Sequence, residues 1–141
     1  MKYLFDSNII SEPSKPEPDK KVLDLIFQNQ PFAAVSTVSY FEMKHGILIL
    51  PEGKRKERLL AFLTQTIEPF YEFIPYDLKA AGINAEILAK LESVGNPIPF
   101  ADSQIASVAL SRSLVLVTRN VKDFLPIQKY FPLQIENWFK Q

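Results

Sequence analysis

The stretch YLFDSNIISEP, residues 3–13, places a carboxylate at the end of an apolar run. Residues 2–6 (KYLFD) have the pattern of a short buried strand, which ends at Asp6. An acid in this position is either an ordinary turn residue or a functional group at the edge of a sheet. The second interpretation requires that acids from other segments reach the same edge.

The whole chain, residues 1–141, has the composition of one globular domain. Hydrophobic residues make up 47% of it and charged residues 23%. There is no cysteine and only one histidine, so any metal ion would be held by oxygen ligands, which suits Mg²⁺ or Mn²⁺. Net charge is zero, with 16 basic and 16 acidic residues, which argues against general coating of nucleic acid but permits local binding.

No apolar run approaches the ~20 residues of a membrane span, and no signal-peptide pattern is apparent at the start. We therefore expect a cytoplasmic protein without membrane contact.

Strand and helix patterns alternate along the chain. The predicted strands are residues 2–6, 32–36, 70–76, 114–118 and 132–138. The predicted helices are residues 20–29, 37–50, 54–66, 77–91 and 99–111. Residues 11–19, which contain three prolines, are predicted to be an irregular loop, and residues 119–127 a loop with one helical turn. This order predicts an α/β three-layer sandwich with a mostly parallel, roughly five-stranded sheet.

Further acids fall where such a fold would collect them, at the carboxyl edge of the sheet. Glu42 lies in the helix after the second strand, Asp102 in the first turn of a nearly all-apolar helix, and Asn120 and Asp123 after LVLVT (114–118). Each has an ordinary alternative, as a solvated helical residue, a helix N-terminal acid or a turn residue. Together with Asp6 they predict a cation site, because two carboxylates ~4 Å apart repel by about 4 kcal/mol. Such a site supports metal-assisted hydrolysis of a phosphodiester.

Four segments, in order, resemble the motifs of the PIN domain, and within it the VapC-type toxins of toxin–antitoxin pairs, including the FitB-like group. They are YLFDSNIIS (3–11), STVSYFEMKHG (36–46), IPFADSQIASVAL (98–110) and LVTRNVKDF (116–124). The resemblance covers nearly the whole chain and implies a metal-dependent endoribonuclease whose products carry a 5′-phosphate and a 3′-hydroxyl.

The resemblance also assigns roles within the site. Asp6, Glu42 and Asp102 match the three acids of the family; Asp6 and Asp102 would hold Mg²⁺ or Mn²⁺, and Glu42 would bind it through water or orient the nucleophile. Asp123 would complete the shell. Asn120 stands where many PIN domains have Asp, so one firmly held metal ion is expected, with a second arriving with RNA.

Three further residues match supporting positions of the family. Asn8 would hydrogen-bond within the site, Ser7 keeps the hydroxyl of a usual Thr, and Thr118 supplies a hydroxyl at the end of its strand. Glu12 has no role that the sequence suggests.

The family implies a homodimer and a cognate VapB-like antitoxin, through which the pair binds promoter DNA. Exposed apolar faces of the helices within 37–66 are the expected antitoxin surface. Candidate RNA contacts are Lys44, Arg55 and Arg119, with GKRKER (53–58) as the densest basic run. That run is equally well explained as a solvated helix start.

Three alternatives can be weighed on residues. A haloacid-dehalogenase-like phosphatase needs an acid where Asn8 stands, and a receiver-type signalling domain needs an acid pair after the first strand and a Lys after the last. Both patterns are missing. A PIN-like binding module with weak or no catalysis is favoured only by Asn120.

Overall fold

The computed structural model describes residues 1–139 and contains one five-stranded sheet. Its strands are β1 (Tyr3–Phe5), β2 (Ala33–Ser36), β3 (Glu72–Ile74), β4 (Val115–Val117) and β5 (Ile135–Glu136). They are ordered β3-β2-β1-β4-β5, and all four pairings are parallel. The carboxyl ends of the strands therefore lie along one edge of the sheet.

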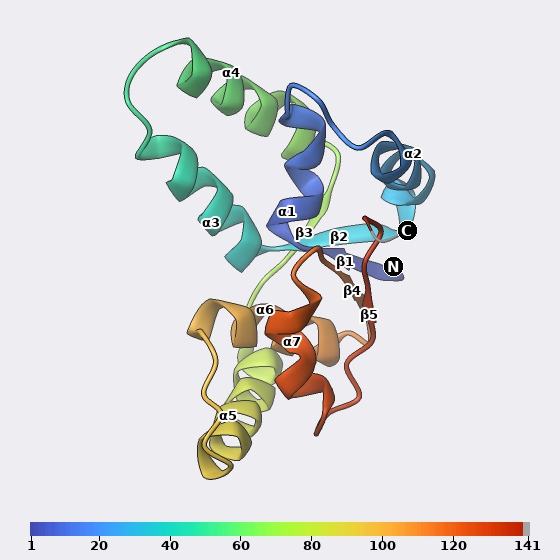
Figure 1. Cartoon of the computed structure of the whole chain (residues 1–141), viewed down its shortest axis with the longest axis vertical. Coiled ribbons are helices and arrows are strands. Elements are labelled where there is room, and N and C mark those ends of the chain that lie inside the picture. Colours follow the sequence, from blue (N-terminus) through green and yellow to red (C-terminus); the bar gives the residue numbers. More distant parts are fainter. Residues whose placement is uncertain (140–141) are drawn as a thin grey trace.

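Helices connect the strands and cover the sheet (Figure 1). They are α1 (Ser7–Ile10), α2 (Lys20–Asn29), α3 (Thr37–Leu48), α4 (Lys54–Phe62), α5 (Leu78–Ser93), α6 (Phe100–Ser111) and α7 (Val121–Gln128). Short 3₁₀ segments follow α1 and α2, namely η1 (Glu12–Ser14) and η2 (Gln30–Phe32). A π-helical segment, η3 (Leu63–Ile67), continues α4.

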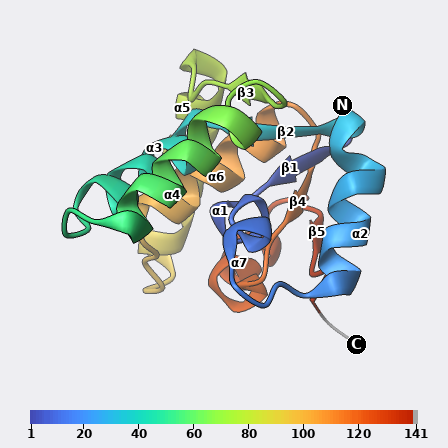
Figure 2. The same cartoon turned by 90° about the horizontal axis from the view of Figure 1, so that it is seen from above.

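Both faces of the sheet are buried, because side chains alternate between them along each strand. Leu4 and Leu116 pack into a core shared with α5, α6 and α7, while Phe5 and Val117 pack into a second core with α1, α2 and η3. Figures 1 and 2 show the two sets of helices on opposite sides of the sheet. The predicted three-layer α/β sandwich is confirmed.

After the first strand, the structure contains a short helix at residues 7–10, for which the sequence made no prediction, and a helical turn within the predicted loop 11–19. Ser7–Ile10 is helical because the Asp6 side chain caps it, accepting the Ser7 N–H at 2.8 Å, and because Ile9 and Ile10 are buried. Within 11–19, Glu12–Ser14 forms a 3₁₀ turn rather than irregular loop, since the fixed φ of Pro13 suits a first helical turn.

Two predictions near the C-terminus are also corrected. Residues 121–128 form helix α7, longer than the predicted single turn, because burial of Phe124 and Ile127 stabilises it despite Pro126. Of the predicted strand 132–138, only Ile135–Glu136 pairs with the sheet. Within the described residues, no helix is long and apolar enough to cross a membrane.

Candidate active site

The register of the central strands places Asp6 beside Thr118. Phe5 on β1 is paired with Val117 on β4, and the Asp6 N–H continues the ladder by donating to the Val117 carbonyl at 3.0 Å. The next residue of each chain segment, Asp6 and Thr118, therefore leaves the sheet at the same edge. Both side chains are buried, with Asp6 only 6% exposed.

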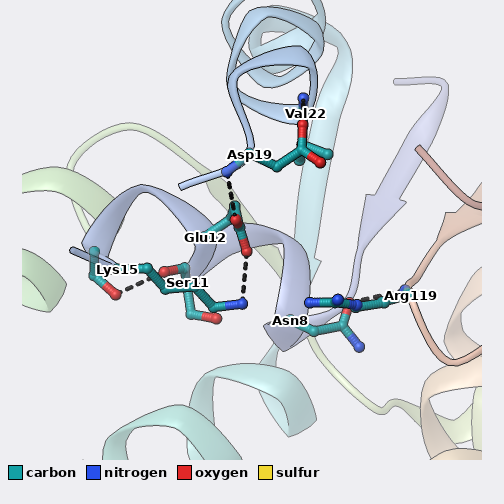
Figure 3. Close-up of polar contacts among 8 residues, drawn as sticks. Asn8, Ser11, Glu12, Lys15, Asp19, Val22 and Arg119 are labelled. Carbon is teal, nitrogen blue, oxygen red and sulfur yellow. Dashed lines mark hydrogen bonds and ion pairs between the residues drawn. The ribbon is translucent and has the colours of Figure 1, made fainter. Parts of the chain in front are cut away.

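The Asp6 carboxylate is held by neutral donors alone. Its Oδ1 accepts the Ser7 N–H at 2.8 Å, and its Oδ2 accepts the Thr118 hydroxyl at 2.9 Å and the Asn8 amide at 3.4 Å. Asn8 is itself fixed, since its Oδ1 accepts the Arg119 N–H at 3.1 Å (Figure 3). Asn8 and Thr118 thus contact Asp6 through their side chains, whereas Ser7 contacts it through its backbone N–H and not through the hydroxyl that the sequence pointed to.

The pKa of Asp6 nevertheless lies above its ordinary value. Burial is the largest cause and the nearby Asp123 carboxylate adds to it, which together outweigh the opposing hydrogen bonds from Thr118, Ser7 and Asn8. Among residues 1–139, no lysine or arginine forms an ion pair with Asp6. The charged form of this side chain is left without a compensating cation.

Glu42 and Asp102 reach the same edge from two other elements. Helix α3 starts directly after β2, where Ser36 caps it by accepting the Ser39 N–H at 3.0 Å, and it carries the half-buried Glu42. Burial raises the pKa of Glu42, and the charges of Asp6 and Asp102 raise it further.

Asp102 lies in the first turn of α6, as predicted. Burial raises its pKa to about 6, with Asp123 and then Asp6 as further causes. Asp123, exposed in the first turn of α7, is thus electrostatically coupled to both aspartates. Four carboxylates from four segments repel one another at one end of the sheet.

The donor set fits a hard divalent cation, since all of its members are carboxylate oxygens. Among the described residues, no three acidic or histidine side chains already converge closely enough to enclose a metal ion. Mutual repulsion opposes such an approach, and a bound cation would relieve it. The chemistry of the cluster is therefore compatible with a hard divalent cation.

An open groove of about 490 Å³ has Glu42 as the one member of this carboxylate cluster in its lining, together with Ser7 and Asn8, which follow Asp6. Residues of α1, α3 and α4 line it, together with Asn120: Ser7, Asn8, Ser11, Glu42, Met43, Gly46, Ile47, Leu50, Arg55, Leu59 and Asn120. The predicted site residues Ser7, Asn8, Glu42 and Asn120 therefore share one surface.

The predicted RNA contacts do not share that surface equally. Arg55 lines the groove. Lys44 instead lies with Phe41 and His45 along a separate apolar depression on α3. The Arg119 guanidinium lies over the Phe139 ring, 4.6 Å from its centroid. Of the three, Arg55 alone lines the same groove as Glu42.

Glu12 is the buried acid whose place the sequence did not indicate. It is 2% exposed, its Oε1 lies 2.8 Å from the Lys15 ammonium, and its Oε2 accepts the Asp19 N–H at 2.8 Å (Figure 3). The i, i+3 spacing of Glu12 and Lys15 was the available signal. Glu12 ties the end of α1 to the start of α2.

A parallel α/β sheet with clustered carboxylates at its carboxyl edge is an arrangement found in proteins that bind a divalent cation and act on phosphate groups. The sequence model of the PIN domain matches residues 3–126, and the chain belongs to the PIN domain family. Its relatives include toxin FitB of Neisseria gonorrhoeae, 34% identical over 126 residues, which cover 86% of this chain and 89% of FitB.

A second relative is the VapC ribonuclease Y4jK of Sinorhizobium fredii, 31% identical over 124 residues, covering 86% of this chain and 89% of Y4jK. Among solved structures, FitAcB from Neisseria gonorrhoeae superposes with a TM-score of 0.87 at 29% identity, covering 99% of each chain. Homologues of this chain are thus ribonucleases and toxins. The phosphatase and receiver alternatives are excluded.

Proposed function

We propose that this protein is a Mg²⁺- or Mn²⁺-dependent endoribonuclease and the toxin of a toxin–antitoxin pair. The main supporting observation is that Asp6, Glu42 and Asp102, which come from separate segments, all have raised pKa values. Burial and the charges of neighbouring carboxylates cause these shifts. Raised carboxylate pKa values in a groove are typical of functional sites. Membership of the PIN family and the ribonuclease relatives support the same activity.

In this proposal, Asp6 and Asp102 hold the metal ion, and Asp123 completes its surroundings. The bound ion would neutralise charge on the scissile phosphate and activate a water molecule. Glu42, half-buried on the groove wall, orients the attacking water. Thr118 fixes the Asp6 carboxylate by donating to its Oδ2, and Asn120 contributes a neutral amide where a fifth acid would add repulsion.

The predicted partners follow from the relatives. A cognate, VapB-like antitoxin would neutralise the toxin and contact promoter DNA on behalf of the pair, which the structure of VapBC2 from Rickettsia felis bound to a DNA fragment from its promoter supports. The exposed Phe41, Leu48 and Ile49 of α3 and its C-terminal end are candidates for a protein interface, either the antitoxin surface or a homodimer contact. We also propose one PIN domain over residues 1–141 and a cytoplasmic location.

The test is cleavage of a 5′-labelled RNA by the purified protein. We expect cleavage with Mn²⁺ or Mg²⁺, none with EDTA, and products ending in 5′-phosphate and 3′-hydroxyl groups. Cleavage that persists in EDTA, or that leaves 2′,3′-cyclic phosphates, would contradict a metal-dependent hydrolysis. A correctly folded protein that binds but never cuts RNA would instead identify a PIN-like binding module.

A further inference from the structure

A second groove, of about 540 Å³, adjoins the groove beside the carboxylates. One wall is the first part of α4, with Lys54, Arg55, Arg58 and Leu59, and the facing wall is the segment Ser14–Pro16. Arg55 and Leu59 line both grooves. The two grooves therefore form a continuous path that leads away from the acids along α4.

The α4 wall of this second groove carries positive charge that no acid neutralises. Lys54, Arg55 and Arg58 are exposed. Among residues 1–139, none of the three forms an ion pair, whereas their helix neighbour Lys56 pairs with Glu52. The chain as a whole is neutral, so this wall is a local concentration of cations.

The facing wall is held in place by an exposed hydrogen bond from Arg58 and by contacts of the buried Glu12. Arg58 Nη1 donates to the Ser14 carbonyl at 2.9 Å across the groove. Lys15 is paired with the buried Glu12, which also accepts the Asp19 N–H, and Asp19 in turn caps α2 by accepting the Val22 N–H at 3.1 Å (Figure 3). The groove is therefore formed before any ligand binds.

We propose that this basic groove binds the backbone phosphates of the RNA strand next to the scissile bond. The inference rests on the proposed function. An RNA strand that approaches four carboxylates is repelled by them, so its neighbouring phosphates need positive charge beside the site. Arginine pairs with phosphate through two parallel N–H donors. Arg55 lines both the groove that contains Glu42 and the second, basic groove, so it lies where the two meet. Lys54 and Arg58 extend that charge along the path.

The test compares RNA binding of the parent protein with that of Lys54→Ala/Arg55→Ala. Binding of a fluorescein-labelled single-stranded RNA is measured by anisotropy in EDTA, at several salt concentrations. We expect the double variant to bind at least about ten-fold more weakly, with the slope of log K against log salt reduced by roughly 1.4. In cleavage with Mn²⁺, KM should rise while kcat stays close to that of the parent.

Two matched variants serve as controls. Lys79→Ala/Lys90→Ala removes the same charge from α5, which lines neither groove, and should leave RNA binding unchanged. Arg55→Lys keeps the charge but loses the paired donors, and should fall between the parent and the double variant.

Unchanged RNA affinity and salt slope in the double variant would overturn the proposal, as would a parent protein whose RNA binding does not depend on salt. Loss of antitoxin binding with RNA binding intact would overturn it too, because the groove would then be a protein interface. Salt-dependent binding that needs Lys54 and Arg55, in a protein that cuts no RNA, would support the groove and contradict the proposed nuclease. Metal-dependent cleavage that is the same in the double variant and the parent would support the proposed nuclease and contradict the proposed groove.

Discussion

Two buried carboxylates stand at the two ends of the short helix α1, and their surroundings are opposite. Asp6, 6% exposed, precedes α1 and accepts hydrogen bonds only from neutral groups. Glu12, 2% exposed, follows α1 and has a lysine ammonium 2.8 Å away. Similar burial thus comes with a compensating cation at one end and without one at the other.

The contrast distinguishes a structural acid from a functional one. Burying a carboxylate costs several kcal/mol unless a partner offsets it. Lys15 and the Asp19 N–H offset that cost for Glu12, which secures the joint between α1 and α2. Around Asp6 the neighbouring charges, Asp123 above all, add to the cost. The metal ion proposed above would compensate the charge of Asp6, whereas Glu12 has its compensation within the chain.

The largest effect that would sharpen this contrast is on catalysis. Asp6→Asn keeps the side-chain volume, removes the charge and replaces one of the two acceptor oxygens with an NH₂ donor, so RNA cleavage should fall by about a thousand-fold or more while the fold is kept. Glu12→Gln should retain cleavage within about ten-fold. Asp24→Asn, exposed on α2, is the control for loss of an acid elsewhere. Initial rates with Mn²⁺ check all three; equal rates for Asp6→Asn and the parent would remove Asp6 from the site.

The second-largest expected effect is on stability, where substitution of Glu12 should cost more than substitution of Asp6. Glu12→Ala leaves the Asp19 N–H without its acceptor and Lys15 without its acid, and should lower the free energy of unfolding by about 2 kcal/mol. Asp6→Asn, measured without metal, should lower it far less or raise it. Urea unfolding followed by circular dichroism gives both values. A larger loss for Asp6→Asn would break the comparison.

The smallest expected effect is a pH dependence of stability in EDTA. The pKa of Asp102 is about 6 in the folded protein, above its ordinary value, so its protonation favours the fold. That contribution is complete below about pH 4 and is lost as the pH rises through about 6.

Asp102→Asn removes this loss. Because Asp102 is partly exposed, the variant should gain only about 1 kcal/mol over the parent between pH 4 and pH 7.5. Unfolding midpoints at these two pH values measure the gain, with Asp24→Asn as the control. A gain that shrinks with rising pH would contradict the direction of the shift.

Much of this molecule follows from local patterns in its sequence. In the run LVLVT, leucines alternate with the β-branched residues Val115, Val117 and Thr118, a pattern that suits a strand buried on both faces, and β4 lies within it at the predicted place. The strand ends also indicated which side chains meet, because parallel strands bring their carboxyl ends to one edge. Asp6 and Thr118 are neighbours for this reason, although 112 positions separate them in the chain.

Other features depend on contacts between segments that no local pattern contains. The sequence of α1 is too short to predict a helix, and its formation depends on the Asp6 cap and on burial of Ile9 and Ile10. The side of α3 on which Lys44 lies follows from how α3 packs on α4 and α6. Likewise, the basic groove exists because Arg58 reaches the Ser14 carbonyl across two distant segments.

The most direct test of whether Asp6 is a metal ligand is calorimetric titration with Mn²⁺ in the absence of RNA. It compares the parent, Asp6→Asn and Glu12→Gln proteins. The parent and Glu12→Gln should bind Mn²⁺ with similar affinity, and Asp6→Asn should bind at least about a hundred-fold more weakly. Equal Mn²⁺ binding by Asp6→Asn and the parent, with both proteins folded, would contradict the assignment of Asp6 as a metal ligand.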